Sequence, residues 1–366
     1  MMNSHHRWLR GFARSASVIA AALMLSSVAL AGDVRFSSEG HAQHPVWSLD
    51  GKYVAFEVNR FAGDIKLYVS EVKAGAVASP ASEVKLPGGA SAFGGGGQVV
   101  VNPIWHPQGI MVFEGSNQSG AFRLYYASPG GAAAAEMLPS TKAPGDLTFP
   151  SISQDGNLLA FVTDSTGSGD VMSWNRNTDK FQQITSTPGS EMFPQFSADS
   201  QNILFTRKKN DVEAIYLSNL SSGVETVVAS GNGDQTRPNF AADDKIVYFT
   251  NERGQGNWDL AVINQDGSGK RVLAKGIRLP HRARPAISPD GRWVAYAFDD
   301  PSKSDSVWIS STDGASTVEI TTEFKACGEP ALTLNSAGQL LLAYTALPAA
   351  NSDWRFLHVT DISGRL

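Results

Sequence analysis

The sequence has few of the residues on which several common classes of protein depend. Only one of its 366 residues, Cys327, is a cysteine, which excludes an intramolecular disulfide framework and a four-cysteine zinc site. Charged residues make up 18% and the formal net charge is -5, a balance that does not fit a general nucleic-acid-binding protein. No hydrophobic run after residue 31 is long enough to cross a membrane. Glycine and proline are abundant instead, with 35 and 18 residues, which indicates a chain rich in turns.

The first residues have the pattern of a secretory signal peptide. Three arginines precede an apolar run over residues 18–30, which ends in an Ala-Leu-Ala cleavage pattern at residue 31. We therefore expect residues 1–31 to be removed and residues 32–366 to form the mature protein. The compartment expected for it is the periplasm, where it would be a soluble monomer with no stable membrane insertion. The alternative is an uncleaved anchor, although the apolar run is short for a transmembrane span.

One short motif recurs along the rest of the chain, and its clearest copy runs from Arg284 to Tyr296. In this copy a proline precedes a short apolar strand, Asp290-Gly291 supplies a hairpin turn, and a second apolar strand follows. Seven copies are marked by prolines at positions 45, 103, 150, 194, 238, 285 and 330. Their spacing of 44 to 58 residues, filled by short strands, is typical of propeller blades with four strands each. We expect each proline to begin an innermost strand, where its missing N–H removes no ladder hydrogen bond.

The last of the seven units has only three strands of its own. They are expected at residues 331–334, 339–345 and 355–361, and the chain then ends without a fourth. Residues 33–38, which follow the signal, can supply the missing outer strand and so join the two ends of the chain. The sequence therefore predicts an all-β, single-domain, seven-bladed propeller of four-stranded antiparallel blades, closed by the N-terminal strand. Six blades are the alternative.

The repeat resembles that of a known family. Its Pro-x-aromatic-Ser-x-Asp-Gly pattern, with turns such as Asn251-Glu252-Arg253-Gly254, is similar to the Asp-Gly, WD40-like repeat of TolB-like β-propellers, over residues 41–361. The resemblance implies a fold used for interaction platforms, for the lids of serine peptidases and for glycan lyases. TolB itself would carry an α/β domain before a six-bladed propeller and act in the Tol-Pal system. Because only about a dozen residues lie between Gly32 and the first repeat, we expect the present protein to lack that N-terminal domain and not to be TolB itself.

The common catalytic motifs are missing. The sequence has no Gly-x-Ser-x-Gly, and this excludes a prolyl-peptidase arrangement. It also has no His-Glu-x-x-His, no glycine-rich phosphate loop and no paired Cys-x-x-Cys. We therefore expect no catalysis, no cofactor and no bound metal, and we expect Cys327 to be a buried apolar residue rather than a nucleophile.

The positions most informative for function lie directly before the seven prolines, because they should surround one mouth of the central channel. These seven residues, called the mouth ring below, are His44, Asn102, Phe149, Phe193, Arg237, Arg284 and Glu329. The two phenylalanines lie in adjacent blades and the two arginines in the next two, backed by Arg278, His281 and Arg282. We interpret the ring as a recognition surface with an aromatic and a basic sector. Alternatively, the phenylalanines pack under loops and the arginines pair with Glu191, Asp234 or Glu329.

These observations predict a non-catalytic, periplasmic scaffold that binds an envelope protein or an acidic or glycan ligand at the channel mouth. Two alternatives stay open. The resemblance to propeller-fold oligogalacturonate lyases implies a metal-assisted elimination on an acidic oligosaccharide, and a glycan-binding protein without turnover would need no metal. The lyase would require imidazoles to gather at the channel, and the candidates are His41, His44, His106 and His281. The alternative, which the undiagnostic spacing favours, is that these histidines are ordinary loop or surface residues.

Overall fold

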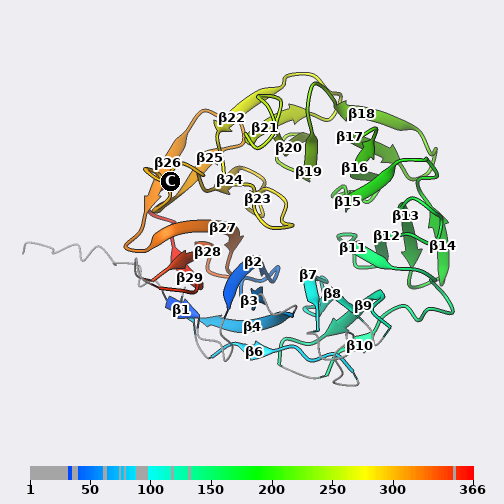
Figure 1. Cartoon of the computed structure of the whole chain (residues 1–366), viewed down its shortest axis with the longest axis horizontal. Helices are drawn as coiled ribbons and strands as arrows, with labels where there is room; N and C mark the ends of the chain where they lie inside the picture. Colours follow the sequence, from blue (N-terminus) through cyan, green and yellow to red (C-terminus); the bar gives the residue numbers. More distant parts are fainter. Residues whose placement is uncertain are drawn as a thin grey trace, which may run out of the picture.

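The computed structural model describes residues 32–34, 40–60, 64–73, 76–77, 80–87, 98–116, 119–130, 133–348 and 352–366. All regular elements in these ranges are β-strands, and they form seven sheets around a central axis (Figure 1). The predicted all-β, seven-bladed propeller is therefore confirmed. In the part of the chain that the structure describes, no helix is long and apolar enough to span a membrane. The predicted signal peptide, residues 1–31, lies outside the described residues.

In blades 2 to 6 the strands follow one another outwards from the axis, and in blade 1 both β5 and β6 pair with β4. Blade 1 contains β2 (His41–Trp47), β3 (Tyr53–Asn59), β4 (Ile65–Lys73), β5 (Ala76–Val77) and β6 (Ser82–Glu83). Blade 2 contains β7 (Val100–Trp105), β8 (Met111–Ser116), β9 (Phe122–Ala127) and β10 (Ala135–Glu136). Blade 3 contains β11 (Leu147–Ile152), β12 (Leu158–Thr163), β13 (Asp170–Asn175) and β14 (Lys180–Gln183). Blade 4 contains β15 (Ser190–Phe196), β16 (Asn202–Lys209), β17 (Val212–Asn219) and β18 (Glu225–Ala229).

The remaining three blades have the same antiparallel arrangement. Blade 5 contains β19 (Gln235–Phe240), β20 (Lys245–Thr250), β21 (Asp259–Asn264) and β22 (Arg271–Lys275). Blade 6 contains β23 (Ala286–Ile287), β24 (Trp293–Tyr296), β25 (Ser306–Ser311) and β26 (Thr317–Thr321). Blade 7 contains β27 (Lys325–Leu334), β28 (Leu340–Leu347), β29 (Phe356–Asp361) and β1 (Gly32–Val34).

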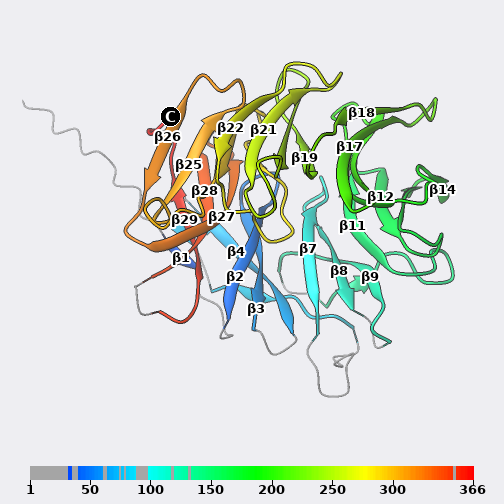
Figure 2. The same cartoon turned by 45° about the horizontal axis from the view of Figure 1, so that its top comes forward.

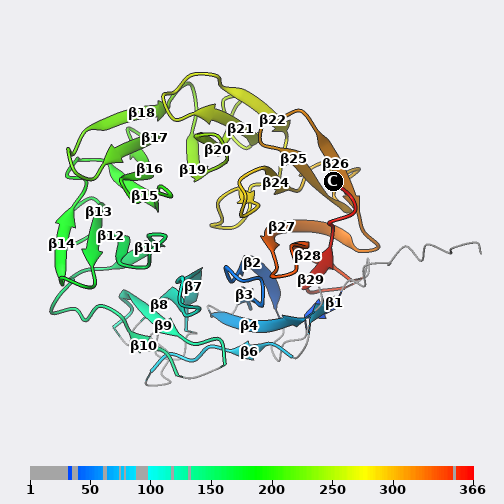
Figure 3. The same cartoon turned by 180° about the vertical axis from the view of Figure 1, so that it is seen from behind.

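Blade 7 is completed by the N-terminal strand. β1 pairs antiparallel with β29, with Gly32 opposite Val359 and Val34 opposite Leu357. Figures 1 and 3 show β1 beside β29 in this blade, while the C-terminus itself lies near β26 of blade 6. The predicted closure is therefore confirmed, and it covers an edge of β29 that would otherwise present unpaired backbone groups.

The prolines do not begin the innermost strands, so this prediction is wrong: six lie within their strands, and in blade 6 Pro285 directly precedes β23. β2, for example, begins at His41, four residues before Pro45, and its pairing with β3 shifts register between Gln43 and Val46. The same shift accompanies the proline in blades 2, 3, 4, 5 and 7. A β-bulge takes the proline out of the ladder, so its missing N–H removes no ladder hydrogen bond even in mid-strand.

The bulge imposes a left-handed backbone on the residue before the proline. In the same six blades this residue has a φ between 48° and 54°, which is unusual for residues other than glycine. Blade 6 differs, because there the left-handed residue is Arg282, two positions before Arg284. The mouth ring thus coincides with a repeated point of backbone strain.

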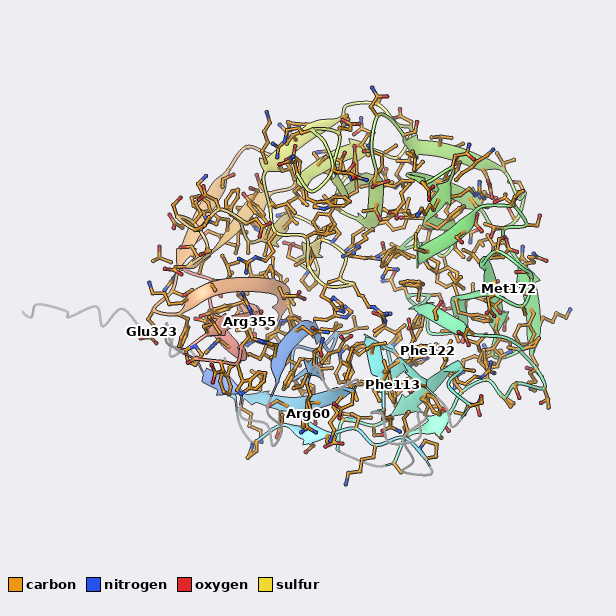
Figure 4. The ribbon with its side chains drawn as sticks, viewed as in Figure 1. Arg60, Phe113, Phe122, Met172, Glu323 and Arg355 are labelled. Atoms are coloured by element: carbon orange, nitrogen blue, oxygen red, sulfur yellow. The ribbon has the colours of Figure 1, made fainter. Side chains whose placement is uncertain are left out.

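Seven apolar clusters join neighbouring blades around the ring, one at each interface. Figure 4 shows side chains filling the space between the ribbons, among them the fully buried Phe113 of β8. The tryptophans of the repeat add a polar link, since Trp105 Nε1 donates to Val46 O of the preceding blade over 3.0 Å. Cys327 is fully buried in the cluster between blades 6 and 7, as expected.

Candidate functional site

A cavity of about 490 Å³ lies in the central channel, and every blade contributes residues to its wall. Six of the nine predicted site residues line it, namely His44, Asn102, Phe149, Phe193, Arg282 and Arg284. Arg237, Glu329 and His281 do not line it, but they contact residues or segments that do. The segment before β23 lies towards the axis, as the tilted view in Figure 2 and the axial view in Figure 1 both show. The structure therefore brings most of the predicted residues to one hollow.

The aromatic sector of the mouth ring is a packed pair. The rings of Phe149 and Phe193 have their centroids 4.6 Å apart at an angle of 56°. Arg237 lies against the same pair, with its Cζ 5.3 Å from the centroid of the Phe193 ring. Phe193 is only 7% exposed, whereas Phe149 remains half-buried at the cavity wall. The sector offers one accessible aromatic surface rather than two.

The basic sector is held by backbone carbonyls. Arg237 Nη1 donates to Pro280 O over 2.5 Å and, more weakly, to Ala283 O over 3.4 Å. Arg284 Nη2 donates to Pro194 O over 2.5 Å, which connects blade 6 to blade 4. Among the described residues, neither side chain forms an ion pair with a carboxylate, so the alternative pairing with Glu191, Asp234 or Glu329 is wrong. Glu191, for example, pairs with Arg207.

Arg282 stands apart from the other channel arginines. The N–H of Ala283 donates to His281 O over 2.7 Å, which closes a tight turn with Arg282 at its apex and a φ of 54°. Such a γ-turn is rare and strained for a residue with a side chain. The guanidinium of Arg282 makes no hydrogen bond or ion pair with any residue that the structure describes. Its neighbour Arg278, also expected to back the ring, instead contacts Asp299 at 3.5 Å and donates to Cys327 O.

Three buried or half-buried carboxylates connect the blades beneath this ring, and two of them, Glu57 and Glu114, were not predicted. Glu57 accepts the backbone N–H of Asn102 in the next blade over 2.8 Å. Glu114 likewise accepts the N–H of Phe149 over 2.6 Å. Glu329 accepts the N–H of His44 over 3.0 Å, across the closure between blades 7 and 1. Each carboxylate thus holds the strained mouth-ring residue of the following blade.

A fourth connection of the same kind is made by a hydroxyl group, because Thr206 Oγ1 accepts the N–H of Arg237 over 3.1 Å. Glu57 and Glu114 also bind side chains: Glu57 is 2.9 Å from His44 Nδ1, and Glu114 is 2.6 Å from Asn102 Nδ2. The second oxygen of Glu57 accepts from Gln43 Nε2 over 2.9 Å. The main role of these acids is therefore to support the ring.

The pKa of Glu57 and that of Glu114 are shifted in opposite directions, although both side chains are buried. Burial raises the pKa of Glu114 to about 7, against the opposing effect of the hydrogen bonds from Asn102 and Phe149. Burial also favours the protonated form of Glu57, but hydrogen bonds and charge from His44, with those from Gln43 and Asn102, leave its pKa below the ordinary value. Glu57 is therefore charged at neutral pH, and Glu114 titrates there.

Burial also acts on the basic groups and on Glu329. It lowers the pKa of Arg284 to about 10, so this guanidinium stays protonated at neutral pH. It lowers the pKa of His281 and of Arg237, and the positive charge of Arg282 lowers both further. Burial raises the pKa of Glu329 despite hydrogen bonds from the N–H groups of His281 and His44. Arg284 is therefore charged at neutral pH, while burial favours the protonated form of Glu329.

The four candidate metal-binding histidines have separate surroundings. His41 Nδ1 accepts from the N–H of Arg355, the residue labelled in Figure 4, over 3.2 Å. His106 is buried against blade 3, with Nε2 3.0 Å from Gly156 O. Only His44 and His281 come close, through their shared partner Glu329. Across the described ranges no group of three His, Cys, Asp or Glu side chains is placed to hold a metal ion, so the donor set does not fit one.

Comparisons of fold and sequence agree with this architecture. TolB from Acinetobacter baumannii superposes with a TM-score of 0.56 at 17% identity, over 78% of this chain and 67% of that one. Oligogalacturonate lyase from Vibrio parahaemolyticus gives 0.59 at 10% identity, over 92% and 91%. An oligogalacturonate lyase in complex with manganese gives 0.58 at 12% identity, over 91% and 90%. At these identities the likeness concerns the fold alone.

No curated protein matches the chain by sequence. A family model described as the TolB beta propeller domain matches residues 133–335, which span the outer strand of blade 2, blades 3 to 6 and β27 of blade 7. This match takes in more than half of the 366 residues. The chain therefore belongs to the TolB β-propeller family.

Proposed function

We propose that the protein is an exported, periplasmic binding scaffold that holds a ligand, or a segment of a partner protein, in its central channel without catalysis of its own. The observation that carries this proposal is the cavity of about 490 Å³, to which all seven blades contribute. Its size falls within the range of ordinary ligand pockets, about 300–1,000 Å³. The signal-like N-terminal sequence supports the exported location.

The wall of the cavity has the composition of a recognition site. Phe149 supplies an apolar surface, while Arg282 and Arg284 supply positive charge. Arg284 is fixed by its bond to Pro194 O, and the backbone before Phe149 is fixed by Glu114. Preorganised groups lose little conformational entropy on binding, so such a wall suits selective recognition.

The carboxylates near the channel favour binding over catalysis. Glu57 and Glu114 are at most 1% exposed, and their oxygens receive hydrogen bonds from the framework. A general base needs to reach a proton of the substrate at hydrogen-bond distance. These two acids are instead engaged in holding the blades together.

A lyase or glycan-binding protein that acts on acidic oligosaccharides is the second candidate. Its support is the likeness in fold to oligogalacturonate lyase, which extends over nine tenths of both chains. The separate positions of the histidines do not support the metal-assisted form of this reaction. A direct test is to incubate the protein with oligouronates, with and without Mn²⁺, and to follow the absorbance of unsaturated products.

The scaffold proposal is tested by replacing Phe149, Phe193, Arg237 and Arg284 together with Ala, Ala, Gln and Gln. We expect the immobilised wild-type protein to capture a defined partner from envelope extracts and the quadruple variant to lose it. A control variant, Arg292→Gln with Val227→Ala, changes exposed residues outside the channel and should capture normally. Near-ultraviolet circular dichroism verifies folding, and the single variant Phe149→Ala serves if the quadruple variant does not fold. Unchanged capture by a folded channel variant would refute the proposed site.

A further inference from the structure

We infer, on the basis of the proposed channel-binding function, that the group recognised in the channel is an organic carboxylate and that the guanidinium of Arg282 anchors it. The carboxylate belongs either to a free small molecule or to a peptide side chain or C-terminus. Four features of the described residues support this assignment: ion pairing, the use of hydrogen-bond donors, backbone strain and the apolar residues in the cavity wall.

The two most deeply buried arginines, Arg123 and Arg207, are paired with acids, whereas the half-buried channel arginines, like Arg355 outside the channel, are not. Arg123 pairs with Glu136 at 2.9 Å, and Arg207 pairs with Glu191 at 2.5 Å and with Glu225 at 2.8 Å. Within the described ranges, Arg237, Arg282 and Arg284 form no ion pair. Glu114 and Glu329 act on Arg282 and Arg237 only from beyond ion-pair distance, and an anionic ligand in the channel would supply a direct partner.

The donors of the channel arginines are also incompletely used. A guanidinium has five N–H donors in a fixed planar arrangement that matches a carboxylate. Arg284 uses Nη2 for Pro194 O, but its Nε is buried and has no hydrogen-bond partner. Arg282 donates to none of the described residues, although it lies in the wall of the cavity. Arg282 therefore presents unused donors to the hollow, while the unpaired Nε of Arg284 is buried in the wall beside it.

The backbone of Arg282 has a conformation that is unfavourable for arginine. A φ of 54° at the apex of a γ-turn suits glycine or asparagine far better than arginine. Stability alone would favour one of those residues here. An arginine kept in this conformation, with its side chain unbonded, is better explained by a contact with a ligand.

The remainder of the cavity indicates the kind of anion. Phe149 and the apolar residues Ile104 and Leu332 contribute to the same wall as the arginines. A purely inorganic anion would leave these apolar surfaces uncovered, whereas an organic carboxylate covers them while its charge meets Arg282. The overall net charge of -5 also argues against long-range attraction of a large polyanion.

The probe we would use is N-acetylphenylalanine, with its neutral carboxamide as the matched control and inorganic phosphate as a second anion. Calorimetry and thermal shift should detect the carboxylate and give little signal with the carboxamide or with phosphate. A peptide that ends in phenylalanine, with a free or amidated C-terminus, distinguishes a peptide source from a free small molecule. Equal binding of the carboxylate and the carboxamide would overturn the inference.

Substitution of Arg282 separates recognition from structure. Arg282→Asn should weaken binding of N-acetylphenylalanine about tenfold or more, because a charge-assisted pair is lost. It should leave the Tm of the free protein unchanged or higher, because asparagine tolerates the left-handed conformation. Arg282→Lys should retain part of the affinity, and Arg292→Asn should change nothing. A lowered Tm with unaltered binding in Arg282→Asn would assign Arg282 a structural role and refute the inference.

The two proposals can fail separately. In one case the quadruple channel variant loses its partner, while Arg282→Asn keeps both the partner and the affinity for the carboxylate. The channel then binds a partner, but the inference about the carboxylate is wrong. If the folded quadruple variant keeps its partner, the channel-binding function itself is wrong. If both variants lose binding while the two control variants, Arg292→Gln with Val227→Ala and Arg292→Asn, do not, both proposals are supported.

Discussion

Glu114 connects the stability of the ring to pH. It is 1% exposed, and one of its oxygens, Oε1, accepts from both Asn102 Nδ2 and the N–H of Phe149. The variant Glu114→Gln can keep that oxygen as the acceptor of both bonds and place its amide at the other position. It removes the charge and leaves the connection between blades 2 and 3 intact.

The size and sign of the effect follow from the pKa. Burial raises the pKa of Glu114 from 4.5 to about 7 in the folded protein. Each pH unit corresponds to about 1.4 kcal/mol, so ionisation costs the wild type at most about 3 kcal/mol of unfolding free energy above pH 7. Because the folded pKa lies above the unfolded one, the favourable contribution is complete below about pH 4.5 and is lost as the pH rises through 7.

Urea unfolding of the wild type and of Glu114→Gln at pH 8.5 and pH 5 measures this contribution. We expect the variant to be more stable than the wild type at pH 8.5, by up to about 3 kcal/mol, with a difference that shrinks towards pH 5. Glu57→Gln is the matched control, because hydrogen bonds reach both oxygens of Glu57 and its pKa is lowered.

The control should behave in the opposite way. Glu57→Gln loses hydrogen bonds to a charged acceptor, so we expect it to be destabilised by about 1–3 kcal/mol at pH 8.5. The contrary result is that Glu114→Gln is destabilised by the same amount at both pH values. The Glu114 carboxylate would then act as a charged acceptor for its donors, as we expect of Glu57. The reasoning on burial would then be refuted.

Two further perturbations test the ring and its core. The first removes β1, by comparing a chain that begins at residue 32 with one that begins at residue 35. The shorter chain should have a lower Tm and should associate through the exposed edge of β29. Equal Tm and equal light scattering of the two chains would contradict the closure. Arg207→Leu should cost about 3–5 kcal/mol in urea unfolding, because it leaves the buried Glu191 without its partner, and a loss below about 1 kcal/mol would contradict that account.

The architecture was predictable because propeller repeats are nearly one-dimensional. Seven prolines at similar spacing identified seven blades, and the missing fourth strand after residue 361 identified the closing role of the N-terminal segment. The position of each proline within its strand was not predictable by the same reasoning. The absence of an N–H is compatible with a strand start and with a bulge, and only the pairing between strands distinguishes them.

The acids beneath the ring were missed because, in the sequence, Glu57 and Glu114 resemble ordinary polar residues in alternating strands. A comparison of equivalent positions could have singled them out, since both follow a phenylalanine in the second strand and the corresponding residues in blades 3 and 4 are Val162 and Thr206. Their function depends on the backbone of the next blade, more than thirty residues away along the chain. Arg282 was named only as a neighbour of the ring, because its unusual φ has no signature in the sequence.

The bulge before each proline has a further consequence for how such a ring can change. In four blades the framework holds the mouth-ring residue by its backbone N–H, through Glu57, Glu114, Thr206 or Glu329. Every amino acid except proline carries that N–H, so its own side chain is not needed for the inter-blade bond. Substitution among histidine, asparagine, phenylalanine and arginine at these positions therefore leaves the hydrogen bonds between blades in place. In each of these residues the backbone N–H contributes to the closure of the ring, and the side chain determines the chemistry at the channel mouth.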